Sequence, residues 1–166
     1  MAPSAPIINT IIDALVAGVS TITAGAVYNY SMGDVSGEMK TLEEIIAIGA
    51  ALPAVYILTQ EEAYGEQFAN DGRSTATLHF FILVEDATTP RKTLMKTKQD
   101  ICIWIEKNID AMRATIQGFD EIEPTMLDMS QPYQVLGINI EPVNRPNAVG
   151  RLDVDIKYKY TLANGG

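Results

Sequence analysis

The segment RLDVDIKYKY, residues 151–160, alternates charged and apolar side chains without interruption. Such alternation is typical of a β-strand, because successive side chains of a strand point to opposite faces of the sheet. The apolar face consists of Leu152, Val154, Ile156, Tyr158 and Tyr160. The charged face consists of Arg151, Asp153, Asp155, Lys157 and Lys159. We expect the apolar face to cover helices and the charged face to meet either water or a second copy of the chain.

Two other segments have the apolar spacing of helices. In the first, Pro6 precedes apolar residues at steps of three and four, and we expect this helix to end before Gly25. The second begins at Pro90, and its apolar residues recur at steps of four and seven. We expect the second helix to end near Gly118, because glycine is a frequent helix terminator.

Strand patterns occupy several further segments. They lie at 26–30, 54–60, 74–86 and 133–141. The turn Asn70-Asp71-Gly72 predicts a hairpin between the second and third of these segments, and the strand at 74–86 is apolar on both faces, which indicates a central position. A turn rich in Pro and Gly predicts another hairpin, between 133–141 and 151–161.

This order of elements predicts a single α+β domain over residues 1–166. The sheet should be largely antiparallel, with the helices packed on one of its faces. Residues 31–41 contain turn-forming residues and are expected to form a flexible loop. Residues 119–132 read as an acidic connector, and residues 161–166 as a frayed tail.

Charge is unevenly distributed along the chain, whose formal net charge is −9. Residues 34–71 carry eight acidic side chains and one lysine, whereas residues 91–113 carry six basic and three acidic side chains. Segregated charge suits subunits that meet through unlike surfaces, although an ordinary solvated surface is an equally good explanation. Specific DNA binding is disfavoured, because such binding depends on neutralising phosphates with basic residues.

The residues that usually carry chemistry are sparse. Cys102 is the only cysteine, and His79, the only histidine, lies in an apolar strand pattern, which favours a core or interface histidine over a catalytic base. Asp153 and Asp155 share a strand face and could act as paired carboxylates, but the lysines beside them favour a charged surface. We therefore expect no enzyme activity, catalytic residue, cofactor or metal. The apolar segment at 45–58 is too short to span a bilayer, so we expect no membrane contact.

The combined pattern resembles that of phage tail terminator and tail-completion proteins. The resemblance lies in an amphipathic N-terminal helix, in Leu52-Pro53 followed by the strand AVYILTQEE, in TLHFFILVED leading into a long helix, and in the closing RLDVDIKYKY. It covers most of the chain and includes no diagnostic motif. It implies a subunit of a hexameric ring that caps the tail tube and joins it to the head connector, located in the virion after synthesis in the host cytoplasm.

The implied partners are further copies of the chain, the tail tube protein, and a head connector or neck protein, while DNA passes without specific binding. We expect the subunit interface to include Arg91, Lys92, Lys96, Arg151, Asp153, Asp155, Lys157 and Lys159. We expect contacts with the tube or connector at Asp34, Glu38, Lys40, Glu61, Glu62 and Glu66. The alternatives are a tail tube or head-completion protein and, less favoured, a small metal-dependent hydrolase that uses Asp153 and Asp155.

Overall fold

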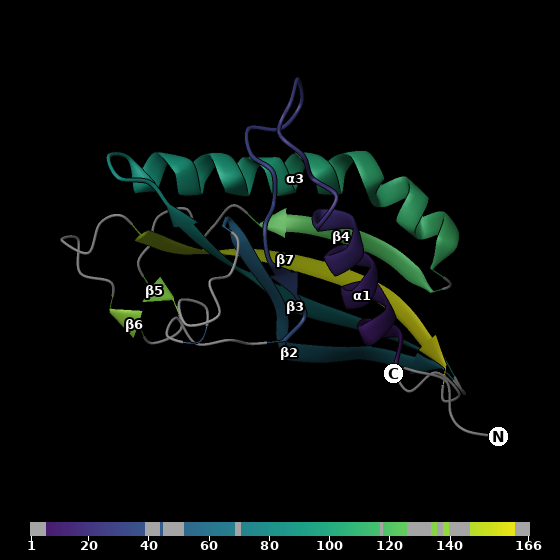
Figure 1. Cartoon of the computed structure of the whole chain (residues 1–166). Helices are drawn as coiled ribbons and strands as arrows, with labels where there is room; N and C mark the ends of the chain where they lie inside the picture. The colour runs from purple at the N-terminus through teal and green to yellow at the C-terminus, as the bar shows by residue number, and fades with distance from the viewer. Residues whose placement is uncertain are drawn as a thin grey trace.

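The computed structural model describes residues 6–38, 44, 52–68, 71–116, 118–125, 134–135, 138–139 and 147–161. The elements in chain order are α1 (Ile7–Val19), β1 (Val35–Ser36), β2 (Ala54–Phe68), β3 (Asp71–Glu85), α3 (Pro90–Thr115), β4 (Phe119–Thr125), β5 (Gln134–Val135), β6 (Ile138–Asn139) and β7 (Asn147–Thr161). Figure 1 shows α1 and α3 packed on the same side of the sheet. The predicted α+β fold with helices on one face is confirmed.

The main sheet has the strand order β1-β2-β3-β7-β4. The pairs β2–β3, β3–β7 and β7–β4 are antiparallel, while the short strand β1 is parallel to β2. The hairpin between β2 and β3 and the central position of β3 are therefore confirmed. Strand β2 is longer than expected, since its pairing with β3 continues to Phe68 through two irregularities in the register.

The helices and the sheet enclose the main hydrophobic core. The alternating apolar residues of β3 and β7, including Phe80, Leu152 and Val154, are buried against α1 and α3. The two helices also approach each other closely, because a side chain on Gly18 of α1 would overlap the Trp104 ring of α3. Glycine at this position therefore lets α1 lie directly against α3.

A smaller apolar cluster lies on the other face of the sheet. It consists of Ala54, Tyr56, Phe81, Leu83 and Val149. Each of these residues is at most 5% exposed, so both faces of the sheet contribute to the interior. Figure 1 shows the paired strands β5 and β6 on this side, away from α3.

Helix α3 begins as the sequence predicts, with Pro90 in its first turn. The turn that leads into the helix is held by Asp86, whose carboxylate accepts hydrogen bonds from the backbone N–H groups of Thr88 and Thr89 and from the hydroxyl of Thr93 in the first turn of α3. These bonds, led by that from the Thr89 N–H, hold the pKa of Asp86 well below its usual range. The chain leaves the helix through Gly118, whose φ of 91° is readily adopted only by glycine.

Three local predictions were wrong. Residues 26–30 form no strand and instead belong to the loop between α1 and β1. The first part of the acidic connector is strand β4, paired with β7, so the sequence analysis missed an edge strand. Within the expected strand at 133–141, the described residues form β5 and β6, which pair with each other, whereas the described partners of β7 are β3 and β4.

Two further expectations concern chain segments that are described only in part. Within the expected loop 31–41, Val35–Ser36 forms β1, and residues 39–41 lie outside the described residues. The mobility of this loop stays a prediction. Residues 162–166 of the expected tail also lie outside the described part of the chain.

The hydrogen bonds of Asp86 predict a pH-dependent loss of stability. We expect Asp86→Ala to lower the melting temperature at pH 7, because the turn before α3 loses the acceptor for two N–H groups and the helix loses the bond of the Thr93 hydroxyl. A carboxyl group whose pKa falls on folding stabilises the fold above its unfolded pKa of about 3.9, and this effect disappears as the pH falls towards the folded pKa. The difference in melting temperature from wild type should therefore shrink below about pH 4.

Thermal unfolding followed by circular dichroism between pH 7 and pH 2.5 measures this difference. Asp86→Asn is the matched control, because its amide oxygen can still accept hydrogen bonds, and it should cost less than Asp86→Ala at pH 7. A difference between wild type and Asp86→Ala that does not change with pH would contradict the assignment.

Candidate interaction surfaces

The charged face of β7 is partly engaged within the sheet itself. Asp153 lies opposite His79 of β3, and its Oδ1 is 2.5 Å from the His79 Nδ1. The same oxygen lies 3.0 Å from the Nε of Arg151. Two residues further on, Asp155 accepts a 2.7 Å hydrogen bond from the hydroxyl of Thr77, its partner in the register. These side chains hold β7 to β3 in addition to the backbone ladder.

The predicted core position of His79 is confirmed. Its exposed fraction is 7%, and its ring lies beside that of Phe81, with 6.0 Å between the ring centroids. A buried imidazole requires a polar partner, because an unsatisfied polar group in the interior destabilises the fold. Asp153 supplies that partner, so this carboxylate has a clear structural role.

The remaining predicted residues of β7 lie further along the strand. The side chains of Lys157 and Lys159 are exposed. The backbone of Lys157 lies opposite Glu121 of β4, and the backbone N–H of Lys159 donates to the carbonyl of Gly118. The two lysines are therefore the most exposed residues on the charged face of β7.

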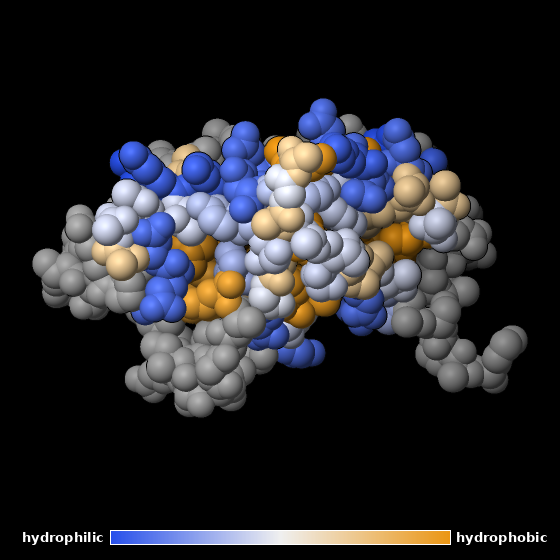
Figure 2. All heavy atoms as spheres, turned by 45° about the horizontal axis from the view of Figure 1, so that its top comes forward, coloured by the Kyte–Doolittle hydropathy of each residue, from blue (hydrophilic) through white to orange (hydrophobic). Residues whose placement is uncertain are grey.

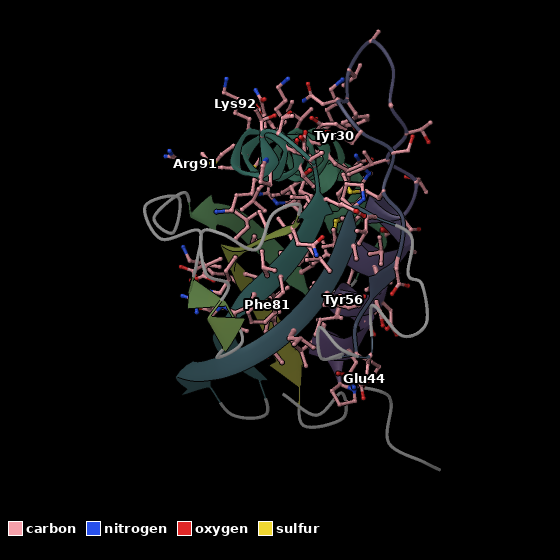
Figure 3. The ribbon with its side chains drawn as sticks, turned by 60° about the vertical axis from the view of Figure 1, so that its left-hand side comes forward. Tyr30, Glu44, Tyr56, Phe81, Arg91 and Lys92 are labelled. Atoms are coloured by element: carbon pink, nitrogen blue, oxygen red, sulfur yellow. The ribbon has the colours of Figure 1, made fainter. Side chains whose placement is uncertain are left out.

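A second charged surface lies at the start of α3. It consists of Arg91, Lys92 and Lys96, and we call it the basic surface. All three side chains are exposed, and within the described part of the chain none of them forms an ion pair. Figure 3 shows Arg91 and Lys92 projecting outward from the helix. In Figure 2, hydrophilic residues follow the side of the molecule that α3 forms.

The residues predicted for subunit contact thus form two surfaces. The basic surface belongs to the helix layer, which covers one face of the sheet. The charged residues of β7 alternate with its core residues and so lie on the opposite face. One neighbouring surface cannot cover both sets at once, and the basic surface is the less engaged of the two.

The acidic residues predicted for contact with the tube or connector have different surroundings. Asp34 is half-buried, and its carboxylate accepts a 2.9 Å hydrogen bond from the hydroxyl of Tyr56. Burial and this bond raise the pKa of Tyr56 well above its usual value. Glu38 is exposed. Asp34 therefore helps to hold β1 against β2, while Glu38 is free to face solvent or a partner.

The other residues of that set are described incompletely. The backbone of Glu61, Glu62 and Glu66 lies in β2, where Glu61 and Glu62 occupy consecutive positions paired with β3. Their side chains, and Lys40 as a whole, lie outside the described residues. Their proposed contacts stay predictions.

Two residues of the basic surface lie far from one exposed acidic residue, Glu44. In Figure 3, Arg91 and Lys92 are at one extremity, whereas Glu44 is at the other. Glu44 is exposed and belongs to the acidic segment at 34–71. One subunit therefore presents unlike charge in two different directions.

The structure gives few other pointers to chemistry. Within the described ranges, no three or more His, Cys, Asp or Glu side chains lie together in a way that could hold a metal ion. The helices in these ranges are too short or too polar to cross a membrane. Asp153 and Asp155, the carboxylates of the hydrolase alternative, each bond to neighbouring side chains.

Sequence reasoning missed the buried carboxylate of Asp100. This side chain on α3 is fully buried, and it accepts hydrogen bonds of 2.8 to 3.0 Å from the backbone N–H groups of Asn29 and Tyr30 and from the Asn29 amide. Its position beside Ile101 and four residues before Trp104 was the available signal. An acidic residue on the buried side of a helix requires donors from elsewhere in the chain.

The sequence matches no known protein family and no curated protein. The placement of the charged and buried polar residues is therefore the main basis for a functional proposal. Two of these arrangements lead to predictions about stability. They are the contacts of Asp153 with His79 and Arg151, and the hydrogen bond between Tyr56 and Asp34.

Removing the Asp153 carboxylate should destabilise the fold. We expect Asp153→Ala to lower the free energy of unfolding by about 2 to 3 kcal/mol, because buried His79 loses its acceptor and Arg151 loses a counter-ion. Urea unfolding at pH 7 measures the loss. The control is Asp110→Ala, whose carboxylate makes an exposed 3.5 Å ion pair with Arg113 and should cost at most about 0.5 kcal/mol. Equal losses in the two variants would contradict the structural role of Asp153.

The bond between Tyr56 and Asp34 should make stability fall at high pH. A tyrosine whose pKa rises on folding stabilises the fold below its unfolded pKa of about 10, and this contribution is lost as the pH rises above that value. We expect Tyr56→Phe to cost about 1 to 2 kcal/mol at pH 8, with a smaller difference from wild type at pH 11. Urea unfolding at the two pH values measures both numbers. A constant difference would disprove the coupling.

Proposed function

We propose that this protein is a non-enzymatic structural component of a phage tail. Its subunits assemble head to tail into a hexameric ring that caps the tail tube and joins it to the head connector. The observation that carries the proposal is the placement of Arg91 and Lys92, on the exposed basic surface, and of Glu44, in the acidic segment, at opposite extremities of one subunit (Figure 3). The assignment to a phage tail rests in addition on the resemblance in sequence pattern described above.

Unlike surfaces on opposite sides favour a particular type of assembly. Each subunit can present its basic surface to the acidic segment of the next, which leaves one free surface of each kind at the ends. Such heterologous contacts close into a ring when the rotation between subunits permits. Arg91, Lys92 and Lys96 supply the basic side of this contact, and the exposed Glu38 of the acidic segment is the candidate that we test for the acidic side.

Overall acidity fits the passage of DNA through such a ring. A formal net charge of −9 on each subunit gives a ring a strongly negative field. Phosphates are repelled by such a field, so DNA can pass through the lumen without adhering. The virion is the corresponding location, with the tail tube protein and a head connector or neck protein as neighbours.

A tail tube or head-completion protein is the nearest alternative. A tube protein extends into long filaments, whereas a terminator closes into single rings. Negative-stain electron microscopy of the purified protein distinguishes these forms directly. Filaments would favour the tube alternative.

Reversing the basic surface should weaken ring formation. We expect the wild type to form a ring at low salt and to dissociate as salt increases, because screening reduces the attraction between exposed charges. The triple variant Arg91→Glu, Lys92→Glu, Lys96→Glu should need at least about tenfold higher protein concentration to assemble, at roughly 0.2 to 1 kcal/mol per lost pair and a further cost for repulsion. Analytical ultracentrifugation across a concentration series measures this shift.

The control keeps the charge change on the same helix. Lys107 lies on the exposed side of α3, nearly five turns from the start of the helix, and the variant Lys107→Glu should assemble like wild type. The single substitution Glu38→Lys should also weaken assembly, because it removes the acidic side of the contact. A wild type that stays monomeric at high concentration and low salt would contradict the ring.

A further inference from the structure

Strand β2 forms most of one edge of the sheet. It spans the 15 residues Ala54–Phe68, whereas its outer neighbour β1 has only two residues and pairs with Val55 and Tyr56. In Figure 1, β2 runs along the lower border of the sheet. Among the strands that the structure describes, none pairs with the outer side of β2 beyond this short contact. We call the outer side of residues 59–68 the open edge.

Hydrogen bonds at the start of β2 show which backbone groups face outward. The N–H of Val55 donates to the carbonyl of Asp34. The carbonyl of Pro53 accepts from the N–H of Gly33. Backbone groups of successive residues in a strand point to alternate sides, so those of odd-numbered residues face the β1 side up to the first irregularity in the register. The N–H and carbonyl of Thr59 therefore point outward, beyond the end of β1.

The open edge can take up another strand. The side chain of Thr59, where this edge begins, is exposed. A strand edge with unpaired N–H and carbonyl groups is a template for a further strand, and many peptide-binding proteins use such an edge. Backbone hydrogen bonds then supply affinity, and the side chains around them supply selectivity. The charge of the edge therefore indicates which strands it can accept.

The residues of the open edge are acidic. Glu61, Glu62 and Glu66 lie in this part of β2, and no basic residue occurs between Lys40 and Arg73. Charged residues on an edge strand protect a protein against pairing between identical copies. They do not protect against a strand of opposite charge, because unlike charges across two paired strands attract each other. The open edge is therefore suited to a strand that carries Lys or Arg.

The opposite edge of the sheet is acidic as well. It is β4, whose seven residues include Asp120, Glu121 and Glu123 and no base. If a second copy paired β4 with the open edge, acidic residues would come together, and like charges opposite each other destabilise a strand pair. The same holds for two open edges. The charges of both edges thus disfavour a second copy as the added strand and favour a different protein.

We infer that the open edge binds an extended, basic segment of a different protein by adding it to the sheet as an extra strand. Because the β2–β3 register has two irregularities, which bend a strand, the added strand should be short. In the proposed tail, the tube or connector protein would supply this segment, and only that assignment rests on the proposed function. The three glutamates are among the residues expected from the sequence to contact that protein.

Model peptides test the binding with the purified protein. The probe is a labelled eight-residue peptide that alternates Lys and Val, and fluorescence anisotropy at low salt measures its dissociation constant. Two matched peptides replace either each Lys by Glu or each Val by Pro. We expect the Lys–Val peptide to bind at least about tenfold more tightly than both. The Glu–Val peptide lacks the opposite charge, and the Lys–Pro peptide cannot pair as a strand.

Two substitutions at Thr59 test the location of the site. Proline is tolerated on an edge strand where the N–H faces outward, so Thr59→Pro should lower the melting temperature by less than about 4 °C. It should weaken binding of the Lys–Val peptide at least about fivefold, because the edge loses an N–H donor. Thr59→Val keeps this N–H and should bind within about twofold of wild type.

Other results would overturn strand addition. Equal binding of the Lys–Val and Lys–Pro peptides would show attraction by net charge alone, and equal binding of the Glu–Val peptide would exclude the charge match. Normal binding by Thr59→Pro would place the site elsewhere, and unfolding of this variant would show that the N–H belongs to the ladder with β3. The absence of binding by the Lys–Val peptide would also overturn the inference.

The ring and the strand addition fail separately. Each of these results leaves the ring in place, because sedimentation of the wild type without peptide tests ring formation by itself. A monomeric wild type that binds the Lys–Val peptide, but binds it weakly after Thr59→Pro, would overturn the ring and keep the strand addition.

Discussion

The pairing of β3 with β7 determines where every other element can lie. Fifteen consecutive residue pairs, from Asp71–Thr161 to Glu85–Asn147, follow each other without a shift. Because side chains alternate, a slip of one residue would turn the apolar face of β7 away from the helices and turn Asp153 and Asp155 towards them. The bonds of His79 to Asp153 and of Thr77 to Asp155 join residues that are partners in the observed register, and so they oppose such a slip.

Helix α3 connects this sheet to the surfaces that we consider functional. Its start is tied by Asp86 to the preceding turn and presents the basic surface, and its buried Asp100 anchors the loop between α1 and β1 at Asn29 and Tyr30. Further along, the ring of Trp104 packs against α1 at Gly18. One helix thus sets the position of the basic surface and of this loop relative to the core. Rigid support of this kind keeps a contact surface in place before binding.

The structure also separates charges that serve the fold from charges available for contact. Asp153, Asp155 and Asp34 are hydrogen-bonded within the subunit, and replacing them perturbs folding before it perturbs binding. The basic surface and Glu38 are exposed, so their substitution tests assembly with less effect on stability. This distinction makes Glu38 a better probe of subunit contact than Asp34, although both belong to the same acidic segment.

The sequence by itself determined the elements with clear periodicity. The alternation at 151–160 and the helical spacing after Pro90 predicted β7 and α3, and the apolar run at 74–86 predicted a central strand. Each pattern arises because one side of the segment is buried, so it can be recognised without knowing which other segments pack against it. Strand β4 was missed because it lies at a sheet edge, where charged residues and Pro124 are tolerated.

Tertiary structure alone decided which polar groups meet. His79 and Asp153 are 74 residues apart, and Asn29 and Asp100 are 71 apart. The segment AVYNY has the composition of a strand, but its backbone N–H groups at Asn29 and Tyr30 bond to Asp100 instead of to a neighbouring strand. The periodicity of a segment specifies which side is buried, whereas its partners depend on register and packing between distant segments.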